Sequence, residues 1–169
     1  MTIDEAIKTA LDYENRVVGV YEEAAKASRD PVGRRVFGTL VDEEKKHVEY
    51  LEARLKEWRE TGHVTAATLG TSVPSRERME AGIGKLKDRA VTEARESEVR
   101  LLKRALDVEV ETSTFYVNVV KELPPEGQKL FERFVEIEQG HQAIVQAEMD
   151  SVSGLGFWFD MQEFNLESG

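Results

Sequence analysis

Apolar residues recur at every third or fourth position along four stretches of this chain. The stretches cover about residues 2–28, 30–61, 97–122 and 126–150. A period near 3.6 residues is typical of an amphipathic helix with one buried face. Local signals support these limits, because Thr2 and Glu5 fit a capping box and Gly62 follows the second stretch. The pattern predicts an all-α protein with four long helices.

Ionisable side chains interrupt these apolar faces. The second stretch carries Glu44 and His47, and their spacing of three residues places both side chains on one face of a helix. A carboxylate and an imidazole that are buried without partners cost folding free energy. By itself this Glu-x-x-His motif favours an ordinary interpretation, in which Glu44 belongs to a solvated acidic run and His47 is a core histidine.

A repeat within the chain changes that interpretation. The segment Ala10–Glu14 recurs 95 positions later as Ala105–Glu109, and the segment Phe37–His47 recurs 94 positions later as Phe131–His141. Each half therefore predicts a helical hairpin with one isolated glutamate and one Glu-x-x-His on its inner face. Two such hairpins, related by a pseudo-twofold axis, would place six side chains in the middle of an antiparallel four-helix bundle. The six are Glu14, Glu44, His47, Glu109, Glu138 and His141.

Four carboxylates at one level of a bundle need compensating positive charge. Two divalent cations would balance the four negative charges, so the duplicated arrangement predicts a dinuclear metal centre. The alternative is a structural bundle whose polar layer sets the helix register and binds no metal. We place Glu43 off the buried face, and we therefore expect Glu43→Ala to leave the metal content unchanged.

Charge and composition narrow the possible partners. The net charge is −10 and the chain has no basic tail, which disfavours nucleic acid and anionic membranes as partners. The absence of cysteine excludes disulfides and thiolate metal sites. No apolar run is long enough to cross a membrane, and the charged first residues do not fit a signal peptide. We therefore expect a cytoplasmic protein.

The duplicated spacing resembles the ferritin-like di-iron carboxylate superfamily, in its rubrerythrin and bacterioferritin branch, over about residues 2–61 and 97–150. The resemblance implies a long crossover, residues 62–96, between the second and third helices. It also implies two iron ions per bundle, with manganese or zinc as substitutes. Matched by motif, the ligands form three pairs: terminal Glu14 and Glu109, bridging Glu44 and Glu138, and one histidine for each ion, His47 and His141.

The activity implied by this resemblance is that of a di-iron oxidoreductase that reduces hydrogen peroxide or dioxygen. We expect no rubredoxin domain, because the sequence contains no cysteine, so the electrons would come from a separate donor protein or from ferrous iron itself. The alternative is a ferroxidase or iron-storage protein of ferritin type. This sequence departs from the rubrerythrin pattern at one place, because Thr112 and Ser113 occupy the region in which rubrerythrins carry an extra glutamate. This departure favours the ferritin-type alternative. We expect a homodimer for the enzyme and a many-subunit cage for a storage protein.

Two tyrosines are candidate catalytic residues. Tyr21 and Tyr116 lie two turns beyond Glu14 and Glu109 on the same helix faces. We expect each hydroxyl to bond a ligand carboxylate, or each ring to be oxidised near the metals. The alternative is a pair of ordinary bundle aromatics whose buried hydroxyls have other partners.

The remaining segments are less regular. Residues 62–96 contain several glycines and predict a connection with a short helix between Ser75 and Glu96. His63 in this connection follows Glu60 with the same spacing, but Gly62 interrupts the helix, so we do not expect His63 to bind metal. The tail, residues 151–169, is rich in aromatic residues that we expect to pack on the bundle or on a second subunit.

Overall fold

The computed structural model of this chain describes residues 1–29, 31–74 and 96–152. These residues form four α-helices and no strand. The helices are α1 (Ile3–Ala27), α2 (Pro31–Thr61), α4 (Glu96–Glu122) and α5 (Pro125–Val152). The all-helical prediction is confirmed, and no predicted helix limit differs from the observed one by more than two residues.

The helix ends follow from local chemistry. Thr2 caps α1: its side chain accepts a hydrogen bond from the Glu5 amide, and the Glu5 carboxylate accepts one from the Thr2 amide. Prolines begin α2 and α5, at a position where a helix needs no amide donor. α2 ends at Thr61 and is followed by Gly62, whose φ of 75° is a left-handed conformation that glycine adopts without steric cost.

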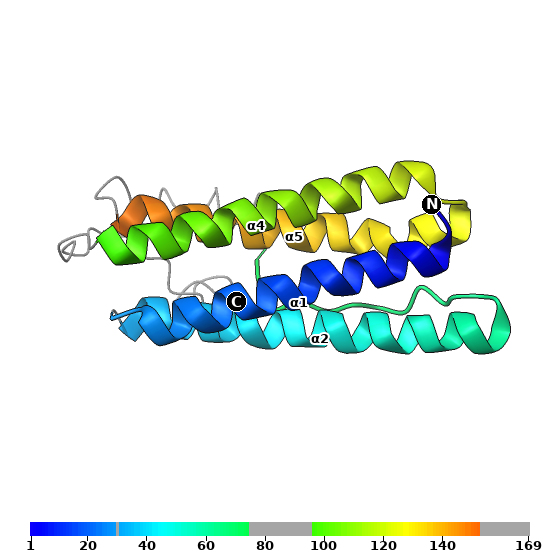
Figure 1. The fold of residues 1–169 in the computed structure, drawn as a ribbon, viewed down its shortest axis with the longest axis horizontal. Coiled ribbons are helices and arrows are strands. Elements are labelled where there is room, and N and C mark those ends of the chain that lie inside the picture. Colours follow the sequence, from blue (N-terminus) through cyan, green and yellow to red (C-terminus); the bar gives the residue numbers. More distant parts are fainter. Residues whose placement is uncertain (30, 75–95, 153–169) are drawn as a thin grey trace.

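The four helices lie side by side (Figure 1). α1 packs against α2, α4 packs against α5, and α1 joins the two pairs by packing against α4. Neighbours within each pair run in opposite directions, as Figure 1 shows by the course of the colours along the chain. α2 ends where α1 begins, whereas α4 begins at the other end of the molecule (Figure 1). This arrangement is compatible with the predicted four-helix bundle.

The core consists of two apolar clusters, one toward each end of the helices. One cluster contains Val20, Phe37 and Leu102, and the other contains Ile7 and Phe131, with further buried residues from all four helices in each. Buried carboxylates and imidazoles occupy the level between the two clusters. The apolar side chains on both sides therefore separate this polar level from water, and they strengthen electrostatic interactions within it.

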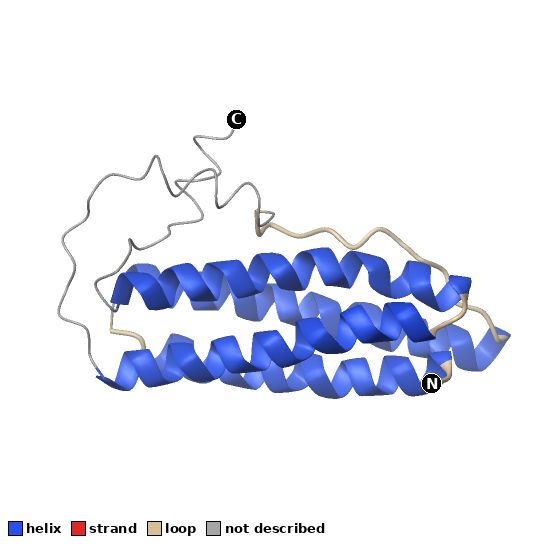
Figure 2. Ribbon diagram, turned by 90° about the horizontal axis from the view of Figure 1, so that it is seen from above, coloured by secondary structure: helices blue, strands red, loops and turns tan. Residues whose placement is uncertain are grey.

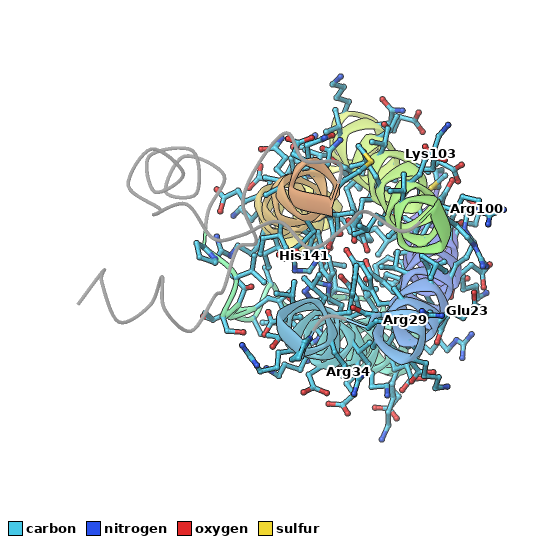
Figure 3. All side chains as sticks on the ribbon, turned by 90° about the vertical axis from the view of Figure 1, so that its left-hand side faces the viewer. Glu23, Arg29, Arg34, Arg100, Lys103 and His141 are labelled. Atoms are coloured by element: carbon cyan, nitrogen blue, oxygen red, sulfur yellow. The ribbon has the colours of Figure 1, made fainter. Side chains whose placement is uncertain are left out.

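Residues 62–74 run back along the side of the molecule between α2 and α5 (Figures 2 and 3). Side chains of α2 hold this segment, because Tyr50 donates a hydrogen bond to the Ala67 carbonyl and Arg54 donates one to the Thr65 carbonyl. α5 holds it too, through a hydrogen bond from Arg133 to the carbonyl of Leu69. The segment thus lies along the seam between α2 and α5.

Two predictions fall outside the described residues: the short helix expected between Ser75 and Glu96, and the packing of the aromatic tail. No helix in the described part of the chain combines the length and the apolar character that a membrane crossing requires.

Candidate metal centre

The six predicted ligands come together at the polar level between the two apolar clusters. α1 contributes one glutamate, α4 contributes one, and α2 and α5 each contribute a glutamate and a histidine. None of the six exposes any surface to solvent, and Figure 3 labels His141 in the interior of the bundle. The fully buried set is Glu14, Glu44, His47, Glu109, Glu138 and His141. The sequence pattern therefore identified which ionisable residues meet in the core.

The two imidazoles lie among the carboxylates. Nδ1 of His47 is 3.0 Å from Glu44 Oε2, 3.3 Å from Glu14 Oε2 and 3.4 Å from Glu138 Oε1. Nδ1 of His141 is 2.6 Å from Glu44 Oε1 and 3.7 Å from Glu138 Oε2. The two rings stack with centroids 5.5 Å apart and an interplanar angle of 10°. Both histidines therefore direct the same ring nitrogen at the same group of oxygens.

The donor atoms divide into two overlapping sets of four that could each hold a metal ion. One set is Glu14, Glu44, His47 and Glu138, and the other is Glu44, Glu109, Glu138 and His141. Within a set the donor atoms lie within 4.8 Å of one another. Each set has its own histidine and its own isolated glutamate, and both sets share Glu44 and Glu138. This sharing is compatible with the pairing that the sequence resemblance implied.

The two tyrosines form reciprocal hydrogen bonds across the bundle. Tyr21 of α1 donates its hydroxyl proton to Glu109 Oε1 on α4, and Tyr116 of α4 donates to Glu14 Oε1 on α1. The predicted hydrogen bond to a ligand carboxylate is thus present, but each tyrosine bonds the glutamate of the other half of the repeat. Each bond fixes one oxygen of an isolated glutamate, and the other oxygen of Glu14 lies 3.3 Å from Nδ1 of His47.

Three of the carboxyl groups hold protons more strongly than an ordinary glutamate does. Burial, followed by the negative charge of Glu44, raises the pKa of Glu14 to about 8. Burial raises the pKa of Glu109 to about 7. Burial and the charges of Glu44, Glu14 and Glu109 raise the pKa of Glu138 well above its usual range. Protons therefore neutralise these carboxyls when no cation does so.

The fourth carboxyl group and the imidazoles form a charged group at the centre. Burial alone would raise the pKa of Glu44, but the positive charges of His141 and His47 outweigh it and lower this pKa well below the usual range. Burial alone would lower the pKa of each histidine, but the negative charge of Glu44 outweighs it and raises the pKa of both. Glu44 is therefore the carboxylate that stays ionised between two imidazolium rings.

The residues present fit a pair of divalent cations. Glu109 Oε2 and both carboxylate oxygens of Glu138 are buried with no hydrogen-bond partner among the described residues. Native proteins rarely leave buried carboxylate oxygens unpaired, because this costs desolvation energy. Mixed carboxylate and imidazole donors suit iron or manganese. The donor set therefore has both the atoms and the negative charge that two such ions need.

Several other ionisable residues lie away from the centre. His63 is exposed, and its Nδ1 is 3.5 Å from Glu126 Oε1. Asp12 and Asp107 are exposed as well, so the repeat of an aspartate in the two halves has no counterpart in the centre. Glu111 is exposed and pairs with Arg16. α4 thus places one glutamate, Glu109, in the centre.

The burial of two further glutamates was not predicted from the sequence. Glu43 is only 1% exposed, which corrects its assignment to the solvated face. Its spacing of three residues after Leu40 and four before His47 is compatible with the buried face and could have revealed it. Burial alone would raise the pKa of Glu43, but hydrogen bonds from Thr71 and Ser72 lower it. Glu148, two turns beyond His141, is also buried.

Comparison of the chain with models of protein families, with curated proteins and with solved structures gives no match.

Proposed function

We propose that this chain is a ferritin-like di-iron oxidoreductase of rubrerythrin type, which reduces hydrogen peroxide or dioxygen. The observation that carries this proposal is the pair of overlapping four-residue donor sets, which share Glu44 and Glu138 in the middle of the bundle. A dinuclear centre needs shared ligands as well as separate ones, and this arrangement offers both. The connection from α2 to α4, which joins opposite ends of the molecule, is the crossover of this proposed fold.

Each residue has a distinct part in holding such a centre. Glu44 and Glu138 would bridge the two ions, and Glu14 and Glu109 would each bind one ion at its outer side. His47 would complete one set and His141 the other, each through the Nδ1 atom that faces the carboxylates. When bound, a ferrous pair supplies the two electrons that, with two protons, convert hydrogen peroxide into two molecules of water.

The protein groups contribute orientation, protons and exclusion of water. The hydroxyl of Tyr116 holds one oxygen of Glu14, and the hydroxyl of Tyr21 holds one oxygen of Glu109, so neither carboxylate rotates freely. In the metal-free protein the raised pKa values of Glu14 and Glu109 favour their protonated forms, and binding of metal ions would release these protons. The apolar clusters on both sides limit the access of water.

The proposed reaction requires an electron donor and iron. The centre is buried, so reducing equivalents would arrive from a separate electron-donor protein or from ferrous iron itself. A homodimer in the cytoplasm is the expected form of the protein. Metal bound in the cell would be iron, with manganese or zinc as possible substitutes in purified protein.

One observation favours a ferroxidase or iron-storage protein as the second candidate. Thr112 is fully buried and its hydroxyl bonds the carbonyl of Val108, so it offers no extra carboxylate on α4. The six ligands are therefore symmetric between the halves. Size in solution separates the two functions: a dimer with two irons per chain fits the enzyme, whereas a cage of many subunits with excess iron fits storage.

Anaerobic loading with Fe(II) tests the proposal. We expect two irons per chain, and we expect the near-ultraviolet absorbance of ferric iron to develop faster with stoichiometric hydrogen peroxide than with air-saturated buffer. Less than one iron per chain would support a bundle whose polar layer is only structural. Faster oxidation by air than by peroxide, with continued uptake of Fe(II), would support the ferroxidase instead.

A further inference from the structure

Glu43 lies next to the proposed centre but belongs to neither set of ligands described above. It is buried on α2, and a carboxylate oxygen of Glu43 lies within 4.8 Å of a ring nitrogen of His47 and of a ring nitrogen of His141. The equivalent position in the second half of the repeat is Ile137, which is also buried. At this position the two halves of the repeat therefore differ, with a buried carboxylate in the first half and a buried apolar side chain in the second.

The outer nitrogens of the histidines lack a partner. Nδ1 of each ring faces the carboxylates of the centre. Nε2 of His47 and Nε2 of His141 are both buried and have no hydrogen-bond partner among the described residues. A neutral imidazole that binds metal through Nδ1 carries its proton on Nε2, and this proton needs an acceptor. The buried Nε2 atoms of His47 and His141 have no partner, and the buried Glu43 carboxylate lies within 4.8 Å of one nitrogen of each ring. Together these observations indicate a hydrogen-bonded arrangement.

The segment between α2 and α4 fixes the Glu43 carboxylate in position. Ser72 donates a hydrogen bond from its hydroxyl to Glu43 Oε1 at 2.7 Å and one from its amide to Oε2 at 3.3 Å. Lys46 donates a third to Oε1 at 3.2 Å. Pro74 packs close to α5 nearby, since a Cβ added at Gly140 would lie 3.2 Å from the Pro74 carbonyl oxygen. The carboxylate is therefore held between α2 and this segment.

We infer that Glu43 is a positioning residue, which accepts the Nε2 protons of His47 and His141 through a bridging water molecule and so keeps Nδ1 of both rings directed at the metal ions. A separation of up to 4.8 Å without a direct hydrogen bond suits one intervening water. Carboxylates that orient metal-binding histidines in this way determine both the tautomer and the ring direction. This inference depends on the proposed dinuclear centre.

Zinc binding tests the inference without any redox reaction. Native protein, Glu43→Ala and Glu43→Gln would be titrated with zinc against a chromophoric chelator at pH 7. We expect two zinc ions per chain in all three, with an affinity roughly 10–100-fold lower in Glu43→Ala. The loss should be smaller in Glu43→Gln, because the amide oxygen remains an acceptor. The matched control is Asp42→Ala, which removes an exposed carboxylate from the preceding position and should not change the affinity.

Nitrogen-15 NMR of the histidine side chains provides a second measurement. The chain has three histidines, and the exposed His63 is an internal reference. In zinc-loaded native protein we expect the Nε2 protons of His47 and His141 to exchange slowly with solvent, and in Glu43→Ala we expect faster exchange of both. Circular dichroism of each variant checks that the helices are intact.

Three outcomes would overturn the inference while leaving the dinuclear centre in place. Unchanged affinity and unchanged exchange in Glu43→Ala would show that the histidines need no acceptor there. Loss of one whole ion in Glu43→Ala, with unchanged affinity for the other ion, would make Glu43 a ligand. A loss of affinity in Ser72→Ala equal to that in Glu43→Ala would assign the effect to anchoring of the segment. Native protein that binds no metal would instead overturn the proposed function itself.

Discussion

Removing the metal should make the stability of the bundle fall as the pH rises. In the folded protein without metal, burial raises the pKa of Glu14 to about 8 and that of Glu109 to about 7, from an ordinary value of 4.5. Between the ordinary and the raised value, the folded state binds a proton that the unfolded chain has released, so a rise in pH favours unfolding. The contribution of these groups to stability is complete below about pH 4.5. It is lost as the pH rises through about 7 and 8.

The size of the effect follows from the two raised values. One pKa unit corresponds to about 1.4 kcal/mol, so from about pH 5.5 to about pH 8 Glu14 lowers the free energy of unfolding by about 3 kcal/mol and Glu109 by about 2 kcal/mol. The raised pKa values of His47 and His141 act in the same direction, because their stabilising protons are also lost as the pH rises. For a chain of this size, about 5 kcal/mol corresponds to a decrease in Tm of roughly 10–20 °C.

Thermal unfolding of chelator-treated protein, followed by circular dichroism at several pH values in this range, measures the decrease. Protein loaded with Mn(II) serves as the comparison, since cations replace the protons and the difference in Tm between loaded and metal-free protein should widen as the pH rises. In metal-free Glu14→Gln, the decrease in Tm should be smaller by the part that Glu14 contributes. Asp12→Asn, an exposed change on the same helix, should show the same decrease in Tm as native protein. A metal-free Tm that stays constant or increases from about pH 5.5 to 8 would refute this reasoning.

Three further predictions concern single side chains. Glu138→Ala should reduce the bound metal from two ions to at most one, measured by elemental analysis. The control Asp42→Ala should bind as much metal as native protein. Equal metal contents in the two variants would show that Glu138 does not bridge the ions. Tyr116→Phe should keep both ions but lower the free energy of urea unfolding by about 1–3 kcal/mol, because a buried carboxylate oxygen loses its donor; an unchanged urea midpoint would contradict that hydrogen bond. Gly140→Ala should lower the same free energy by about 1 kcal/mol, because its Cβ would press on the segment that covers α5. Gly19→Ala, with open space around the added methyl, should raise it by about 0.5–1 kcal/mol; equal effects of the two alanines would disprove the close approach.

The burial of the six residues of the proposed centre could be predicted because two local signals agreed. Helical periodicity places Glu44 and His47 on the same face as the apolar residues, and the internal repeat places Glu138 and His141 on the equivalent face. A single Glu-x-x-His would have been ambiguous, because many exposed helices contain one by chance. Duplication removed this ambiguity, since both copies would otherwise bury charge without compensation.

Glu43 shows where such reasoning fails. The helical period allows Glu43 and Glu44 to share a wide buried face, but it does not show how wide that face is. The width depends on residues 71–74, which run between α2 and α5 and cover Glu43 through Ser72. The course of that segment has no periodic signal, so the burial of Glu43 could not be read from its own helix.

The four helices, their limits and the six ionisable residues on their inner faces could be predicted from the amino-acid sequence, because helix caps, prolines, glycines and periodicity act over a few neighbouring residues. The contacts between side chains of different helices could not be predicted and are known from the packed fold. It directs Tyr21 to Glu109 and Tyr116 to Glu14, rather than to the glutamates of their own helices. The physical reason is that these pairings depend on the rotation and offset of packed helices, which the packing of the whole core determines.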